Sequence, residues 1–88
     1  MKELLNKGTL VDVRSPQEFA GKHFPNAINI PLEQVAQKVN EFKEMAMPII
    51  AYCRSGNRSG MAVSMLKQAG LNDVINGGGL DDLLQKTK

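Results

Sequence analysis

The residues best suited to chemistry lie in one short stretch, where the only cysteine of the 88-residue chain is followed by two arginines. Cys53 comes directly after the apolar run 49–52, and Arg54 and Arg58 follow it among small polar residues and a glycine. A cysteine attacks as the thiolate, which nearby cations and helix N-terminal N–H groups favour. The pattern predicts a reactive cysteine at the start of a helix, with a buried core cysteine as the alternative.

The residues after Cys53 predict a cradle for an anion bound at the sulfur. Gly56 lets the backbone curl without a Cβ clash, so that several N–H groups can point to one place. Arg54 and Arg58 are expected to attract and orient a negatively charged substrate, with a solvated surface position as the alternative for each. The predicted binding residues are the six that follow the cysteine, Arg54, Ser55, Gly56, Asn57, Arg58 and Ser59.

Two charged residues at the end of another predicted strand, Asp12 and Arg14, are expected to support this loop. We favour a salt bridge or a bracing hydrogen bond between them, and Asp12 could instead orient Arg58. The only histidine, His23, could serve as a general base. A structural role at a helix-to-strand turn is favoured, because a cysteine that is already ionised needs little proton chemistry to react.

Composition narrows the function classes. A chain of 88 residues predicts a single domain over residues 1–88. One cysteine excludes an intrachain disulfide framework and a cysteine-based zinc site, and no metal or cofactor is expected. With 11 basic and 9 acidic residues the net charge is +2, and no basic stripe indicates nucleic acid as a partner.

The chain also lacks the patterns of membrane insertion and export. Its apolar runs are too short to cross a bilayer, so no membrane partner is expected. The first six residues carry an early acid and no long apolar core, so a signal peptide is not expected. A free thiol fits the reducing cytoplasm, and the periplasm stays open if a leader was removed.

Strands and helices alternate along the chain. Short β-branched or apolar runs predict strands over residues 9–13, 27–30, 48–52 and 73–76. Helical spacing and end signals predict helices over residues 2–7, 15–21, 31–42, 58–70 and 80–86. The alternation predicts an α/β fold with a small parallel β-sheet and helices on both faces. Ligands of such sheets bind beyond the carboxyl ends of the strands, where Cys53 lies.

Finer signals mark some of these boundaries. Ser15 is expected to cap the second helix, with Pro16 in its first turn and Glu18 completing a capping box. In the helix that follows Pro31, apolar residues recur on one face, namely Leu32, Val35, Ala36, Val39 and Phe42. Gly70 is expected to end the helix that begins at residue 58. The glycines 77–79 are expected to form a flexible turn into the last helix.

Several segments together resemble the rhodanese family of sulfurtransferases, especially its small single-domain members such as the phage-shock rhodaneses. The matching segments are Leu10–Arg14, Glu18–Phe19, His23–Pro31, Cys53–Arg58 and Gly77–Gly79, in this order. The resemblance implies a rhodanese-like fold, a sulfane-sulfur donor such as thiosulfate and a persulfide on Cys53. It also implies transfer to cyanide or a thiol, with a protein persulfide acceptor as a further partner. Asn26 stands where glycine is common in the family, and asparagine tolerates the left-handed conformation.

Two other functions stay open. Cysteine-based phosphatases and arsenate reductases have a similar loop, but their usual signature has five residues between cysteine and arginine. Here four residues separate Cys53 from Arg58, which favours a smaller pocket for one sulfur atom. The second alternative is a non-catalytic regulatory module, and the intact cysteine counts against it.

Overall fold

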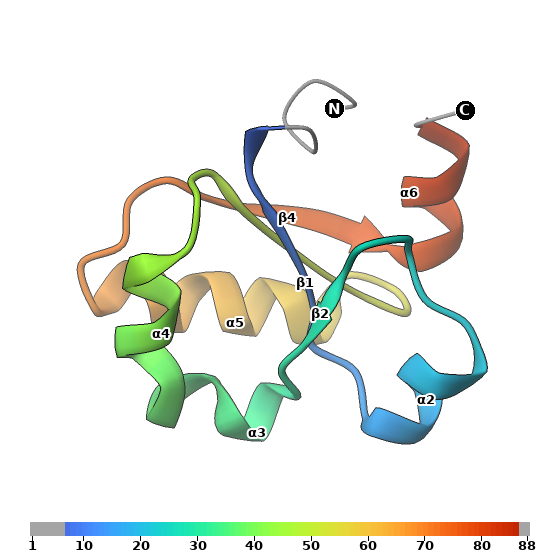
Figure 1. Ribbon diagram of the computed structural model, residues 1–88, viewed down its shortest axis with the longest axis horizontal. Coiled ribbons are helices and arrows are strands. Elements are labelled where there is room, and N and C mark those ends of the chain that lie inside the picture. Colours follow the sequence, from blue (N-terminus) through green and yellow to red (C-terminus); the bar gives the residue numbers. More distant parts are fainter. Residues whose placement is uncertain (1–6, 87–88) are drawn as a thin grey trace.

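A four-stranded parallel sheet forms the centre of the computed structural model, which describes residues 7–86 (Figure 1). The strands are β1 (Thr9–Asp12), β2 (Ile28–Asn29), β3 (Ile49–Cys53) and β4 (Val74–Gly79). Their order across the sheet is β2-β1-β3-β4, and every neighbouring pair is parallel. The predicted α/β class and parallel sheet are confirmed.

Helices connect the strands. They are α2 (Pro16–Gly21), α3 (Leu32–Val35), the 3₁₀ helix η1 (Ala36–Lys38), α4 (Val39–Glu44), α5 (Asn57–Gln68) and α6 (Leu80–Lys86). The single helix predicted after Pro31 is thus divided in three. A 3₁₀ segment winds more tightly than an α-helix, so the apolar residues do not all stay on one face. Val35 and Phe42 are buried as predicted, whereas Ala36 is exposed, which contradicts the predicted apolar face. The helix expected over residues 2–7 lies, apart from Lys7, outside the described residues.

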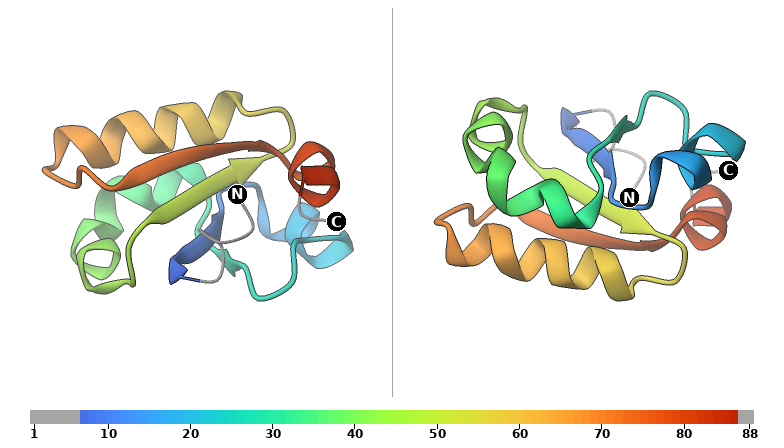
Figure 2. Two further views of the ribbon diagram at one scale, coloured as in Figure 1. Left: turned by 90° about the horizontal axis from the view of Figure 1, so that it is seen from above. Right: turned by 90° about the horizontal axis from the view of Figure 1, so that it is seen from below.

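The two faces of the sheet bury different side chains, because successive residues of a strand point to opposite sides. Val11, Ala51 and Cys53 lie in a core with residues of α3, α4 and α5. On the other face, Ile50 and Tyr52 pack with α6 and the segment before β2. Figure 2 shows helices on both sides of the sheet, as predicted.

Local signals in the sequence are borne out at several turns. The Ser15 hydroxyl accepts a hydrogen bond from the Glu18 N–H at 3.2 Å, and the Ser15 N–H donates to Glu18 Oε1 at 3.1 Å. This is the predicted capping box. Asn26 has φ 70° and Gly70 has φ 101°, so both occupy the left-handed region. Gly70 directly follows Ala69, the capping residue of α5.

The prediction of a flexible turn at residues 77–79 is wrong, because these glycines belong to β4. Tyr52 pairs with Gly78 and Cys53 with Gly79, after a register shift that follows the pairing of Ala51 with Asn76. A side chain at Gly79 would collide with the Arg54 carbonyl oxygen. Because Gly79 has no side chain, β4 can approach the loop after Cys53. No spacing pattern in the sequence predicted this close approach.

Candidate active site

Cys53 is the last residue of β3, and its side chain is buried at the mouth of the loop that leads into α5. The Gly56 N–H donates to its Sγ at 3.0 Å and the Ser59 N–H at 3.4 Å. Gly56 has φ 100° and occupies the N-cap position of α5, which begins at Asn57. The N-terminus of α5 therefore lies against the sulfur as predicted, and two of the expected N–H groups donate to Cys53 Sγ.

The surroundings of Cys53 lower the pKa of its thiol. Burial raises the pKa, but the hydrogen bonds made to the sulfur, among them those of the N–H groups of Ser59, Ser55 and Gly56, outweigh it. Each N–H group favours the charged form, because it donates to the sulfur anion. The site is therefore suited to a thiolate nucleophile near neutral pH.

Asn76 of β4 clamps the loop from the neighbouring strand. Its Oδ1 accepts from the Gly78 N–H at 3.0 Å and from the Ser59 hydroxyl at 2.7 Å, and its Nδ2 donates to the Gly56 carbonyl at 3.1 Å. The Gly78 N–H can only donate and the Gly56 carbonyl can only accept, so the orientation of the amide is fixed. The Ser59 proton therefore points to Asn76.

This geometry decides how the Ser59 hydroxyl meets the sulfur. Ser59 Oγ lies 3.5 Å from Cys53 Sγ, and either atom could donate. A hydroxyl has a single proton, and Asn76 already takes it. We therefore assign the stabilisation of the thiolate to the backbone N–H groups, while Ser59 Oγ is an acceptor for the neutral thiol.

Arg58 forms an ion pair with Glu18, a residue of α2. Its Nη1 lies 2.7 Å from Glu18 Oε1, and its Nη2 donates to Glu18 Oε2 at 3.1 Å. The hydrogen bonds from Arg58 and from the Ser15 backbone lower the pKa of Glu18 from 4.5 to about 2. The pair ties the first turn of α5 to α2, so the Arg58 guanidinium is not free in this structure.

Asp12 and Arg14 form the expected salt bridge. Arg14 Nη2 lies 2.7 Å from Asp12 Oδ2, and both side chains are almost fully buried. The Arg14 N–H also donates to Asp12 Oδ1, and Arg14 Nη2 donates to the Lys22 carbonyl. Among residues 7–86 no hydrogen bond joins Asp12 to Arg58, so the pair braces the turn between β1 and α2.

The remaining predicted residues, and His23, lie on the surface. Arg54, Ser55 and Asn57 are exposed, and Arg54 lines a pocket of about 390 Å³ beside the loop. His23 is exposed, stacks on Phe19 with ring centroids 3.9 Å apart, and its Nδ1 lies 2.8 Å from the Phe19 carbonyl oxygen. Its contacts thus fit the structural role favoured from the sequence.

Sequence reasoning missed two functional contacts. Asn76 was assigned to a strand followed by a turn, and only the pairing of β4 with β3 brings its amide to the loop. Glu18 was identified as a capping residue alone, although its carboxylate also binds Arg58. Because the capping box with Ser15 already explained why a glutamate occupies this position, no further contact of its carboxylate was predicted.

No group of three or more histidine, cysteine or acidic residues within residues 7–86 is arranged to hold a metal ion. In the same part of the chain, every helix is too short or too polar to cross a membrane.

The chain belongs to the family of rhodanese-like domains, whose family model matches residues 1–85. It is 35% identical over 74 residues to the thiosulfate sulfurtransferase PspE of Escherichia coli, covering 83% of this chain and 71% of that protein. A solved rhodanese with anions, also from E. coli, superposes with a TM-score of 0.73 at 34% identity, over 84% of this chain and 88% of the other.

A further relative is longer. The uncharacterized protein YqhL of Bacillus subtilis is 41% identical over 70 residues, which are 80% of this chain. The match covers 55% of that protein, so this chain spans about half its length. The family resemblance noted from the sequence is thus confirmed.

Proposed function

We propose that this chain is a sulfurtransferase that moves sulfane sulfur from thiosulfate or a similar small anion to cyanide or a thiol. The observation that carries the proposal is that the buried Cys53 Sγ accepts hydrogen bonds from the N–H groups of Gly56 and Ser59. The name of the E. coli relative, a thiosulfate sulfurtransferase, supports the same activity. A reducing cytoplasm suits the free thiol.

The reaction would run in two steps through a covalent intermediate. The Cys53 thiolate attacks the outer sulfur of thiosulfate, the sulfur–sulfur bond of the donor breaks, and sulfite leaves with the bonding electron pair. The new persulfide anion, Cys–S–S⁻, is held by loop N–H groups that replace its hydration. Cyanide or a thiolate then attacks the outer sulfur, and Cys53 departs as the thiolate.

The two arginines of the loop receive different roles. Arg54 is exposed and, among the described residues, makes no ion pair, so we assign it the attraction of the anionic donor. Arg58 binds Glu18 through two nitrogens and holds the loop against α2. Asp12 and Arg14 brace the adjoining turn. Ser55 and Asn57 contribute backbone to the cradle.

A phosphatase activity is disfavoured by this arrangement. A phosphate-binding loop needs its arginine to face the anion, whereas the Arg58 guanidinium is paired with Glu18. The loop is also one residue shorter than the usual phosphatase signature. A non-catalytic module would have no use for a thiol with a lowered pKa.

Mass spectrometry of intact protein tests the proposal. Incubation with thiosulfate is expected to add one sulfur atom at Cys53, and cyanide is expected to remove it. The matched control is Cys53→Ser, which keeps the shape of the side chain and should gain no sulfur while its circular dichroism is unchanged. An unchanged mass of the parent protein, together with hydrolysis of para-nitrophenyl phosphate, would instead establish a phosphatase.

A further inference from the structure

Asn76 and Gly77 form the only asparagine–glycine pair of the chain. In such a pair the backbone nitrogen of the glycine can attack the side-chain amide of the asparagine, because glycine has no Cβ to hinder the approach. Asn76 is exposed, so water and a solvent base can reach its amide. The pair is therefore a candidate for spontaneous loss of the side-chain amide.

The pair lies where the regular pairing of β4 is interrupted. Among the described strands, β4 occupies an edge of the sheet. Ala51 of β3 pairs with Asn76 and Tyr52 pairs with Gly78, which leaves Gly77 without a pairing residue in the described sheet. An extra residue of this kind disrupts the ladder locally, as in a β-bulge. The nitrogen that must turn toward the amide therefore belongs to a glycine outside the regular ladder.

The hydrogen bonds of the Asn76 amide favour an attack on it. Oδ1 accepts from the Gly78 N–H at 3.0 Å and from the Ser59 hydroxyl at 2.7 Å. Negative charge develops on this oxygen when a nucleophile adds to Cγ, and donors that already point at the oxygen stabilise the charge. Gly78 and Ser59 therefore act on the Asn76 amide as an oxyanion hole acts on the carbonyl of a substrate.

We propose that Asn76 is a site of spontaneous deamidation, and that this modification lowers the reactivity of Cys53. The Gly77 nitrogen loses its proton to a solvent base and forms a bond to Asn76 Cγ. The Cγ–Nδ2 bond breaks, and Nδ2 keeps the electron pair, takes up a proton and leaves as ammonia. Water then opens the resulting succinimide ring, which gives aspartate or isoaspartate. The net reaction adds water and releases ammonia, so no oxidant is needed.

The modification reaches the sulfur through Gly56. The Gly56 carbonyl accepts from Asn76 Nδ2 at 3.1 Å, and the Gly56 N–H donates to Cys53 Sγ at 3.0 Å. A carboxylate only accepts, so the oxygen that replaces Nδ2 repels the Gly56 carbonyl and displaces this residue from the sulfur. The added negative charge also disfavours the thiolate. Isoaspartate adds a carbon atom to the backbone of β4 and shifts the glycines that pair with Tyr52 and Cys53.

Incubation of the folded protein in mildly alkaline water enriched in heavy oxygen tests the site. Peptide mass spectrometry follows each asparagine, because the oxygen that replaces the amide nitrogen comes from the water. We expect Asn76 to be the dominant site of labelling. Asn57 and Asn72 are internal controls, since both are exposed and neither precedes a glycine. Labelling of Asn76 that is absent, or no faster than that of Asn57 and Asn72, would overturn the proposal.

A second measurement tests the effect on the cysteine. Ion-exchange chromatography separates the deamidated protein, which carries an additional negative charge, from the parent protein. Near neutral pH its Cys53 should react with iodoacetamide about tenfold more slowly, the scale of a lost hydrogen bond that leaves an acceptor unsatisfied. Asn76→Asp should react as slowly, provided that circular dichroism shows it to be folded.

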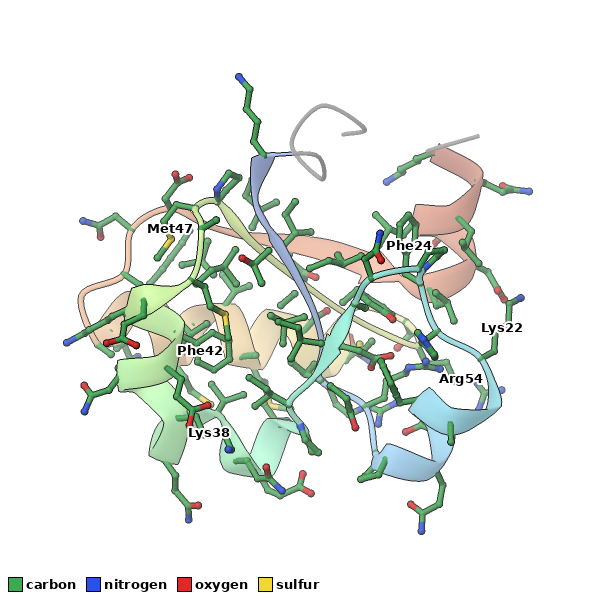
Figure 3. The ribbon with its side chains drawn as sticks, in the orientation of Figure 1. Lys22, Phe24, Lys38, Phe42, Met47 and Arg54 are labelled. Carbon is green, nitrogen blue, oxygen red and sulfur yellow. The ribbon has the colours of Figure 1, made fainter. Side chains whose placement is uncertain are left out.

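The matched control is Asn72→Asp, which makes the same change of charge before the start of β4. The other end of β4 reaches the loop beside Arg54, at the end of the molecule away from Met47 (Figure 3). Asn72→Asp should therefore react at the rate of the parent protein. Parent-like alkylation of the deamidated protein, or of folded Asn76→Asp, would contradict the proposal. Labelling and alkylation do not depend on sulfur transfer, so the outcome is separate from that of the proposed function.

Discussion

The Ser59 hydroxyl donates its only proton to Asn76 Oδ1, at 2.7 Å. The same oxygen lies 3.5 Å from Cys53 Sγ, so it turns a lone pair toward the sulfur. An acceptor in that position stabilises the neutral thiol, whereas the N–H groups of Gly56 and Ser59 stabilise the thiolate. Asn76 of strand β4 thereby influences the pKa of the Cys53 thiol through the hydroxyl of Ser59.

This relationship predicts the effect of Ser59→Ala on the pKa of Cys53. The pKa should stay the same or fall, because the substitution removes an acceptor for the thiol and keeps the backbone N–H donors. The measurement is the rate of iodoacetamide alkylation against pH, with Ser64→Ala as the control, since Ser64 is exposed on the same helix. A rise in the pKa after Ser59→Ala would mean that the hydroxyl donates to the thiolate instead.

The ion pair between Arg58 and Glu18 predicts that the two residues act together. If Arg58 holds the loop in place, Arg58→Gln and Glu18→Gln should both lower kcat for sulfur transfer and have similar effects. Arg54→Gln should instead raise KM for thiosulfate about two- to fivefold, as an exposed charge would, and the effect should shrink at high salt. Steady-state kinetics at two ionic strengths provide the measurement. A lower KM in Glu18→Gln but a higher KM in Arg58→Gln would show that Arg58 itself binds the donor.

The same ion pair predicts a stability change in acid. Hydrogen bonds from Arg58 and from the Ser15 backbone lower the pKa of Glu18 from 4.5 to about 2 in the folded protein, so the contribution of the ionised carboxylate is complete above about pH 4.5 and is lost as the pH falls through about 2. Because both side chains are partly exposed, we expect at most about 1 kcal/mol. Denaturant unfolding of the parent protein and of Glu18→Gln should differ at about pH 6, where the carboxylate is ionised, and converge in acid. A difference that persists at the lowest pH would contradict this account.

The contact of β4 with the loop predicts that Gly79 is required for activity. In Gly79→Ala the new Cβ would collide with the Arg54 carbonyl oxygen, so the loop must move and sulfur transfer should fall. Gly21→Ala is the matched control, because its Cβ meets nothing within 4 Å. Alanine also favours helix by up to about 1 kcal/mol over glycine, so this control should be as stable as the parent or more so. Equal transfer rates for Gly79→Ala and the parent would show that the loop tolerates the shift.

The sequence alone determined the elements that local rules govern. Ser15 and Glu18 mark the start of α2, and the β-branched and apolar runs around Val11 and Ile50 mark buried parallel strands, because capping and side-chain alternation depend on near neighbours. The position of Cys53 between β3 and α5 follows from the same reasoning. So does the salt bridge of Asp12 with Arg14, two residues away.

Only the tertiary structure decided which distant residues reach the cysteine loop. Asn76 meets Gly56 and Ser59 because β4 pairs with β3 through a register shift, and no local pattern encodes that shift. Arg58 finds Glu18 forty residues earlier in the chain because α2 and α5 begin at the same edge of the sheet. Contacts of this kind depend on how whole elements pack, whereas a helix cap depends on a few adjacent residues.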